Sequence, residues 1–554
     1  MSTYRAWAFS RKVIGRLVSL ACAGGLIGAT MLSTAAARAP ANPVDGASQQ
    51  TTHETNPGPD RGTNQMIVRL HDNVAGRMSA PQQRSVILAA AERVSGPVEY
   101  RRDHGNGIHT LRLPRRMSEP ELQEMVAQLE ADPRVAHAEP DRIMRHTVVP
   151  NDAMYAAQWH YQEAVAAVNY GANLPAAWDM EQGDPGIVVA VIDTGYRPHA
   201  DLSGRFVPGY DFIDLDYDFV SSTSFPATAN DGDGRDADAR DPGDWVSAAE
   251  NASGLFAGCG VSSSSWHGTH VAGTIGAVSN NGTGVSGVNW NSKILPVRVM
   301  GKCGGYSSDI IDGMRWAAGL NVPGAPANAN PARVLNLSLG GNGACSSAYQ
   351  NAIDEIVAAG AVVVVAAGNS RGPAAGSSPG NCAGVITVAA TARYGSRASY
   401  SNHGPEVEIA APGGDNRVDT RILSTWNSGT TIPMNDAYAE MQGTSMAAPH
   451  VAGIASLVLS VDPCLTPSAV NDLLRGTVTA FPSGSTCASG DCGTGIVNAG
   501  NAVSTARRMR AEREAAAAVA AAVSEQRTMP RARFAALSAV FIPVITRDWS
   551  TSEC

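Results

Sequence analysis

Three segments of this chain carry the side chains that a nucleophilic serine mechanism needs. Asp193 follows the apolar run 188–192, His267 opens an apolar helical stretch, and Ser445 lies in the sequence G-T-S-M-A. A serine hydroxyl is a weak nucleophile near neutral pH, so it needs a base within hydrogen-bond reach and a third group that orients the base. Each residue alone is more often a helix cap or a turn former. Together, each at the end of an element, they predict a catalytic triad.

Asn369 adds a group for stabilising negative charge. It follows the β-branched run 362–366, which is too short for a helix and predicts a strand. Acyl transfer builds negative charge on the substrate carbonyl oxygen, and a side-chain amide with a backbone N–H can hold it. The Ser445 N–H lies at the start of a predicted helix over 446–460, where amides lack partners and the helix dipole favours an anion.

These four motifs resemble those of the subtilisin-like serine proteases, over about residues 151–503. The order Asp, His, Ser is the order of that family. The resemblance implies an endopeptidase with these roles: Ser445 as nucleophile, His267 as general base, Asp193 as the group that orients the base, and Asn369 as oxyanion donor.

Two other histidines compete for the role of base. The family pattern puts the base at the first histidine of the H-G-T-H segment, so His270, one helical turn later, is assigned a packing or local hydrogen-bonding role. His450 is likewise assigned a structural role.

The resemblance also implies where a peptide substrate binds. An extended peptide would lie as a strand between two segments, with backbone hydrogen bonds giving affinity and pockets giving preference. No charged residue ends the main pocket at 366–370, so we expect broad cleavage after apolar or bulky residues. The substrate-binding candidates are Ser338, Leu339 and Gly340 on one side and Gly304 and Gly305 on the other.

Short apolar runs alternate with helical segments through the same region, which predicts a parallel sheet covered on both faces. The expected fold class is α/β, with a three-layer subtilisin-like core. Active sites in such sheets form outside the carboxyl ends of the strands, where Asp193 and Asn369 would lie. The expected strands are 187–192, 294–299, 334–337, 361–366 and 385–389.

The N-terminal part reads as an export and maturation region. Basic residues, an uncharged stretch from 17 to 32 and A-x-A sites predict a signal peptide over 1–39, and a polar, Pro-rich disordered linker follows over 40–64. A membrane anchor is the alternative, but 16 residues are short for a spanning helix.

Residues 65–147 show a β-α-β-β-α-β pattern, that of a small α+β ferredoxin-like module. Its second helix has a capping pair, Ser118 and Glu121. A module of this kind before such a domain resembles the family's inhibitory propeptide, which acts as an intramolecular inhibitor and is removed autocatalytically, with a cut near Arg145 to Pro150. An independent binding domain is the alternative.

The catalytic domain is expected over 148–504, with an insertion over 214–265 that could shape the cleft. The Ala- and Arg-rich extension 505–554 lies outside the resemblance. It is a removable extension, a secretion element or a docking helix, and the sequence does not decide among them.

Nine cysteines fit an oxidising compartment, since eight remain once Cys22 leaves with the signal peptide. A zinc site is the competing reading, but the spacing lacks paired C-x-x-C motifs. Cys464 and Cys554 are unassigned. The expected disulfides join segments near the cleft or a short turn: Cys259 to Cys303, Cys345 to Cys382, and Cys487 to Cys492.

Two loops suggest structural calcium, with no catalytic metal expected. The acidic loop 230–244 has oxygen ligands alternating with glycines, as Ca²⁺ requires, although a solvated acidic loop is the alternative. The segment 278–285 resembles the family's calcium loop. The candidate ligands are Asp231, Asp233, Asp236 and Asp238 in the first loop, and Asn280, Asn281, Thr283 and Val285 with Asp201 and Asp152 in the second.

Composition agrees with an exported hydrolase that is a monomer when mature. A formal net charge of −9 without long basic runs argues against nucleic acid as a partner, and no mature segment reads as a stable membrane anchor. Two other functions compete: a catalytically silent binding protein that uses the same cleft, and an α/β-hydrolase esterase. The esterase would need a G-x-S-x-G elbow and a triad with serine first.

Overall fold

The computed structural model describes residues 63–117, 119–141, 148–166, 168–218, 223–418, 421–487 and 490–528. The expected signal peptide, nearly all of the linker, Ser118, the first half of the expected maturation cut and the end of the C-terminal extension lie outside these residues.

The N-terminal module has the expected element order. It consists of β1 (Thr63–Leu70), α1 (Asp72–Ala75), α2 (Ala80–Ser95), β2 (Glu99–Gly105), β3 (Ile108–Met117), α3 (Glu119–Glu130) and β4 (Val135–Pro140). The strands form an antiparallel sheet in the order β2-β3-β1-β4. Apolar residues at alternate positions of β1, Met66, Val68 and Leu70, are fully buried with Ile87 and Leu122 from the two helices. The module therefore has its own hydrophobic core.

A parallel sheet forms the centre of the catalytic domain. Among the described residues its strand order is β15-β14-β12-β10-β5-β9-β6, and each neighbouring pair is parallel. The sequence predicted the five inner strands but missed the two edge strands, which are short. The strands are β5 (Val188–Asp193), β6 (Tyr210–Asp211), β9 (Lys293–Arg298), β10 (Val334–Leu337), β12 (Val362–Ala366), β14 (Ile386–Thr391) and β15 (Ile409–Pro412).

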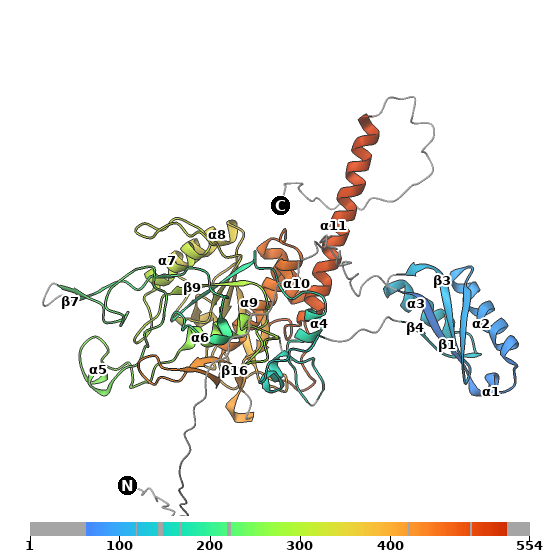
Figure 1. The fold of residues 1–554 in the computed structure, drawn as a ribbon, viewed down its shortest axis with the longest axis horizontal. Helices are drawn as coiled ribbons and strands as arrows, with labels where there is room; N and C mark the ends of the chain where they lie inside the picture. Colours follow the sequence, from blue (N-terminus) through green and yellow to red (C-terminus); the bar gives the residue numbers. More distant parts are fainter. Residues whose placement is uncertain are drawn as a thin grey trace, which may run out of the picture. The chain divides into compact units, whose positions relative to one another are not determined.

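Helices cover both faces of this sheet and make the expected three layers. Val189 and Val191 of β5 point into one core with α6 (His267–Gly276) and α9 (Thr444–Val461), while Ala190 and Ile192 point into the other. That second core holds α7 (Ser307–Ala317) and α8 (Ser347–Ala358), which Figure 1 shows side by side. Because both faces are buried, the strands read as continuous apolar runs instead of alternating ones.

Helix α9 crosses the middle of the first core. By length and composition it could cross a membrane, and among the described residues it is the one helix that could, but 89% of it is buried inside the protein. It packs on β10, β12, β14 and β15. Its first turn is hydrogen-bonded to Ser338 and Asn369, which follow β10 and β12, so its N-terminus lies beside the carboxyl ends of the strands. The apolar character of α9 is therefore that of a core helix.

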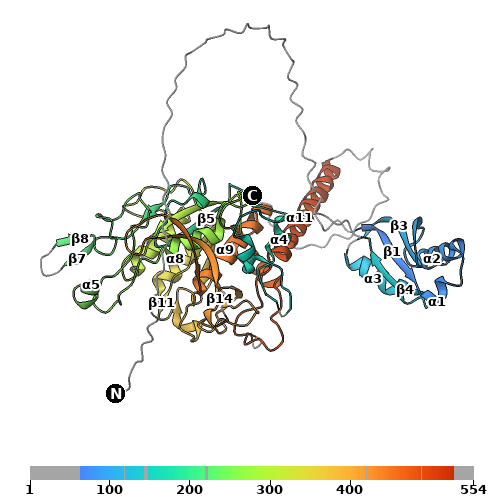
Figure 2. The same cartoon turned by 60° about the horizontal axis from the view of Figure 1, so that its bottom comes forward.

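The insertion after β5 forms irregular structure at one end of the domain. It contains the hairpin β7 (Asp216–Asp218) and β8 (Thr223–Phe225) and the helix α5 (Ala248–Ala252), which both views place away from α11 (Figures 1 and 2). A further hairpin, β16 (Ile422–Asn427) with β17 (Asp436–Met441), leads into α9.

Helix α11 (Ala499–Thr528) runs across the expected boundary between residues 504 and 505. Ala502 and Ala506 are fully buried in the core that contains α9. Farther along, Arg513 donates two hydrogen bonds, of 2.5 and 2.6 Å, to the carboxylate of Asp462 at the end of α9. The first four turns of α11 are thus part of the catalytic body.

Replacing Arg513 with alanine tests this attachment. The Asp462 side chain is fully buried and would lose its cation, so the variant should unfold about 1–3 kcal/mol more easily, less than a fully buried pair costs because Arg513 is one-third exposed. Denaturant unfolding of inactive protein measures this. Arg508→Ala is the control, since its 3.9 Å contact with Glu512 is exposed and should contribute under about 0.5 kcal/mol. Equal stability of the two variants would contradict the assignment.

Candidate active site

Asp193 and His267 form a hydrogen-bonded pair at the carboxyl end of β5. His267 Nδ1 lies 2.8 and 2.9 Å from the two Asp193 oxygens. The Asp193 side chain is fully buried, and the Thr194 N–H also donates to it at 2.7 Å. His267 keeps 17% of its side-chain surface exposed and lines the cleft. With Nδ1 held as donor, Nε2 is the basic nitrogen available to the cleft.

The start of α6 is fitted closely against the turn after β5. A Cβ at Gly268 would lie 2.1 Å from the Gly195 carbonyl oxygen, so only glycine allows this approach. Trp266, just before the helix, has φ of 42° and is held there by burial and by its indole N–H, which donates to the Gly429 carbonyl. Such left-handed backbone at a bulky residue is strained and is typical of functional sites.

Opposing effects set the pKa of His267. Burial lowers it, but the Asp193 carboxylate raises it by charge and hydrogen bonding, and the more distant Asp244 and Asp241 carboxylates raise it further. The outcome is a pKa above the ordinary value of histidine. The imidazole can therefore accept a proton and hold it as a stabilised cation.

Ser445 lies in the first turn of α9, as the sequence predicted. Its hydroxyl donates to the Ser338 carbonyl at 3.0 Å, and the Ser338 hydroxyl donates back to the Ser445 carbonyl at 2.7 Å. Among the hydrogen bonds of the described residues, none joins Ser445 to His267. Both residues line the same cleft, and catalytic hydrogen bonds often form only with substrate bound.

Asn369 is oriented by Thr444. Its Oδ1 accepts hydrogen bonds from the Thr444 N–H at 2.9 Å and the Thr444 hydroxyl at 3.0 Å. The same hydroxyl accepts from the Gly368 N–H at 3.1 Å. Because Oδ1 is engaged, the side-chain NH₂ remains to donate into the cleft that Ser445 lines. Sequence reasoning missed Thr444, although it directly precedes the serine.

One cleft of about 440 Å³ collects these groups with most of the predicted substrate residues. Ser338, Leu339 and Gly340 form one wall and Gly304 lies on the other. A second hollow continues along both walls and adds Gly305. The two segments therefore lie as the sequence interpretation required.

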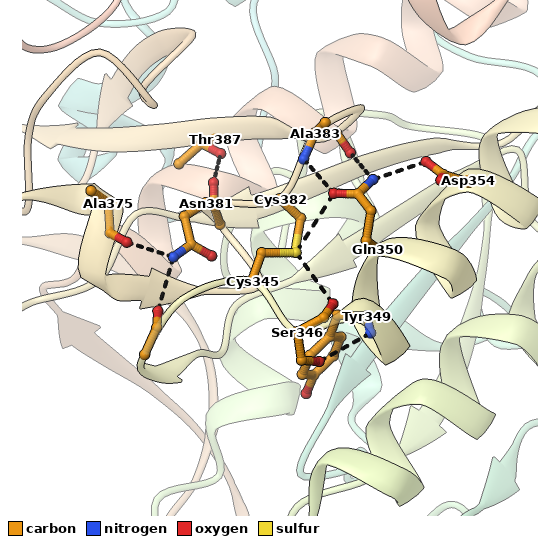
Figure 3. Close-up of a disulfide and its surroundings, with 12 residues drawn as sticks. Cys345, Ser346, Tyr349, Gln350, Asp354, Ala375, Asn381, Cys382, Ala383 and Thr387 are labelled. Atoms are coloured by element: carbon orange, nitrogen blue, oxygen red, sulfur yellow. Dashed lines mark hydrogen bonds between the residues drawn. A yellow bond between two sulfur atoms is a disulfide. The ribbon is translucent and has the colours of Figure 1, made fainter.

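The described residues contain disulfides at the three predicted pairs. Cys345–Cys382 fastens the outer part of one cleft wall (Figure 3). Beside it, Gln350 donates to the Ala383 carbonyl at 3.0 Å and accepts from the Ala383 N–H at 2.9 Å. This wall also includes β11 (Gly341–Asn342), which directly follows Ser338–Gly340 in the chain. β11 pairs with β13 (Ser377–Ser378).

The insertion is attached to the opposite wall by Cys259–Cys303 and by Lys302. The Lys302 ammonium lies 2.6 Å from Glu250 and 4.3 Å from the centre of the Trp245 ring, with 6% of its side chain exposed. It lowers the pKa of Glu250 to about 2, together with hydrogen bonds from Ser247. No local sequence pattern predicts this contact, because the partners are 52 residues apart.

The second calcium candidate has a ligand set that fits. Asp201 accepts from the Asn281 side chain at 2.8 Å and the Val285 N–H at 2.9 Å, and Asp152 accepts from the Asn280 N–H at 2.8 Å. Burial raises the pKa of both carboxyls, and no Lys or Arg pairs with either among the described residues. Two buried carboxylates without a cation suit a Ca²⁺ ion, and because no described group of three His, Cys, Asp or Glu side chains forms here, the remaining ligands would have to be amide or backbone oxygens. Thr283 donates its N–H to Asn281 Oδ1 in the same loop.

In the acidic loop 230–244, two of the candidate calcium ligands form ion pairs with arginines instead. Asp231 pairs with the buried Arg298, which also pairs with Asp211, and Asp238 pairs with Arg240. Asp233 and Asp236 belong to the same loop, and no described group of three or more His, Cys, Asp or Glu side chains is placed to hold one metal ion. Guanidinium groups therefore supply positive charge where the sequence interpretation placed Ca²⁺.

His270 and His450 are fully buried, as their assigned structural roles require. His270 Nε2 is 3.0 Å from the Ile422 carbonyl, and His450 Nε2 is 2.7 Å from Nδ1 of His160. Burial, with nearby histidines, lowers the pKa of His270 to about 3. Neither ring lines the cleft.

An α/β three-layer fold with Asp, His, Ser and Asn at one sheet edge defines a serine hydrolase of the subtilisin type. The chain matches the subtilase family model over residues 184–502. It therefore belongs to the subtilase family.

The individual proteins that are similar to this chain are also named proteases. The chain is 50% identical over 401 residues to an extracellular protease of Xanthomonas campestris pv. campestris, covering 72% of this chain and 64% of that protein. It is 39% identical to the extracellular basic protease of Dichelobacter nodosus, covering 80% and 70%. A solved protease structure from Pseudoalteromonas arctica is 51% identical with a TM-score of 0.59, covering 65% of this chain and all of that one. The chain thus spans somewhat less than two thirds of the Xanthomonas protein.

Thr444→Val tests how the Asn369 amide is oriented. Without the hydroxyl, Asn369 and the Gly368 N–H each lose a hydrogen bond, so kcat should fall about tenfold with KM unchanged, a part of what removing a whole oxyanion donor costs. Steady-state hydrolysis of a chromogenic peptide measures both constants. Thr444→Ser keeps the hydroxyl and should retain most of kcat; a Val variant with unchanged kcat would show that Thr444 does not orient the amide.

Proposed function

We propose that this chain is a secreted serine endopeptidase that hydrolyses proteins through Asp193, His267 and Ser445 and matures by removing its own N-terminal module. The observation that carries the proposal is the placement of His267, bonded to the buried Asp193, in one cleft with Ser445 and Asn369. The extracellular names of the relatives support secretion.

In the proposed reaction, the Ser445 hydroxyl leaves the Ser338 carbonyl and attacks the scissile carbonyl carbon. His267 Nε2 takes its proton, and the buried Asp193 stabilises the imidazolium. The carbonyl oxygen becomes an oxyanion that accepts from the Asn369 NH₂ and the Ser445 N–H.

His267 then gives the proton to the leaving amine, and the C–N bond breaks. A water enters, loses a proton to His267 and attacks the acyl-enzyme ester. Collapse of that second tetrahedral intermediate releases the acid and returns the proton to Ser445, so the enzyme ends as it began.

The substrate is proposed to be an extended peptide lying between Ser338–Gly340 and Gly304–Gly305. The cleft surface at Ala366, Gly368 and Ser370 carries no charge, which favours apolar or bulky side chains before the scissile bond. Strand addition between two walls gives affinity through the backbone, so preference should be broad.

The module over 65–147 is proposed to be the inhibitory propeptide. Its separate hydrophobic core supports a unit that folds and can be released. Structural Ca²⁺ is proposed at Asp152, Asp201, Asn281 and the Val285 loop, where it would balance two buried carboxylates and stabilise the fold.

Ser445→Ala should abolish casein hydrolysis and leave the N-terminal module attached, because both need the same nucleophile. Loss of a triad serine typically costs about 10⁶ in kcat. Intact mass and fluorescent casein assays follow the two readouts. The exposed Ser483→Ala is the control and should behave as wild type. Purified Ser445→Ala protein that clears casein or sheds the module would refute the proposal.

Calcium dependence can be measured in the Ser445→Ala background, which prevents self-digestion. Chelation with EDTA should lower Tm by about 5 °C, the shift expected when a saturating ligand is removed from a domain of this size. Asp201→Asn should remove this response, whereas the exposed Asp233→Asn should keep it. The opposite pattern would move the site to the acidic loop.

A further inference from the structure

The insertion contributes its own residues to the cleft. Asp244, Val246, Cys259 and Ser262 line the same cavity as His267 and Ser445. Val246 and Ser262 exchange backbone hydrogen bonds of 3.1 Å, and Cys259 is bonded to Cys303 in the neighbouring wall. The insertion therefore forms a fixed surface beside the catalytic histidine.

Strand geometry indicates which substrate side chain would meet this surface. In an extended peptide, successive side chains point to opposite sides. If the side chain before the scissile bond enters the pocket at Ala366–Ser370, the preceding side chain points away from that pocket and toward His267. The insertion surface is what it would meet there.

Asp244 gives this surface a negative charge. Both of its oxygens accept from Ser265, at 2.6 Å from the N–H and at 2.6 Å from the hydroxyl. Because Ser265 is two residues before His267, these bonds hold the carboxylate near the histidine. It is the one carboxylate among the described residues lining this cleft, and no Lys or Arg lines it. The donors to this carboxylate are neutral, and among the described residues no Lys or Arg forms an ion pair with it.

Two cations of this region form ion pairs with other carboxylates. Lys302 is paired with Glu250 at 2.6 Å, and Arg240 with Asp238. Residues 214–265 carry nine Asp and one Glu against two Arg. Arg197, outside the insertion, donates to the Asp241 carbonyl, but the insertion itself carries a net negative charge that adds to the negative potential at Asp244.

We propose that Asp244, Val246 and Ser262 form a specificity subsite for the substrate side chain two positions before the scissile bond, and that Asp244 makes it favour a cationic side chain. This inference rests on the proposed endopeptidase function. It refines the expected broad preference, since one position would select by shape and the next by charge.

Matched peptides test the charge preference. Internally quenched substrates that differ only in arginine, citrulline or glutamate at that position share size and shape, and citrulline lacks the charge. For the mature wild type, kcat/KM for arginine should exceed that for citrulline about fivefold at low salt, and glutamate should be poorest; high salt should shrink the ratio.

Asp244→Asn should bring the arginine-to-citrulline ratio to about one, while its amide can still bond Ser265. Using a ratio cancels any effect of Asp244 on His267 that all substrates share. Asp233→Asn, an exposed acid of the same insertion, is the control and should keep the ratio, which separates a local carboxylate from a general field.

A wild-type ratio near one, or a ratio that survives in Asp244→Asn, would overturn this inference while leaving the endopeptidase intact. If neither casein nor any peptide is cut, the proposed function itself fails.

Discussion

The site depends on one constraint, that the carboxyl ends of parallel strands and the start of a buried helix meet at one sheet edge. β5 delivers Asp193 and β12 leads to Asn369, while α9 delivers Ser445 from the other direction. The sheet and α9 are almost completely buried, so none of these ends can shift without opening the core. Groups separated by up to 252 residues are thereby held within one cleft.

The carboxylates around His267 also influence its protonation. Within the described part of the chain no Lys or Arg pairs with the buried Asp193, which is stabilised by His267 and by the Thr194 N–H. Thr194 also links to a further buried carboxylate, Asp241, whose pKa is raised to about 7 by burial and by Asp244. The histidine thus lies in a field of several carboxylates, which favours its protonated form.

Sequence reasoning predicted what local patterns encode. The apolar runs predicted the inner strands, whereas the four site residues were predicted from their positions at the ends of elements together with the family resemblance. It missed contacts that depend on tertiary structure: Thr444 holding Asn369, and Lys302 held by Glu250 and Trp245. The acidic loop was interpreted as a Ca²⁺ site because its sequence of oxygen ligands does not reveal that Arg298, at the end of β9, forms an ion pair with Asp231.

Helix α11 sets a limit on trimming of the C-terminus. A cleft that binds its substrate as an extended strand cannot accept a segment that is helical and packed on the body of the enzyme. Residues up to Arg513 are held by the Asp462 contact and the buried Ala506, so cutting there first requires the helix to unwind from its neighbours. The fold itself therefore limits how far proteolysis could shorten the tail of the folded protein.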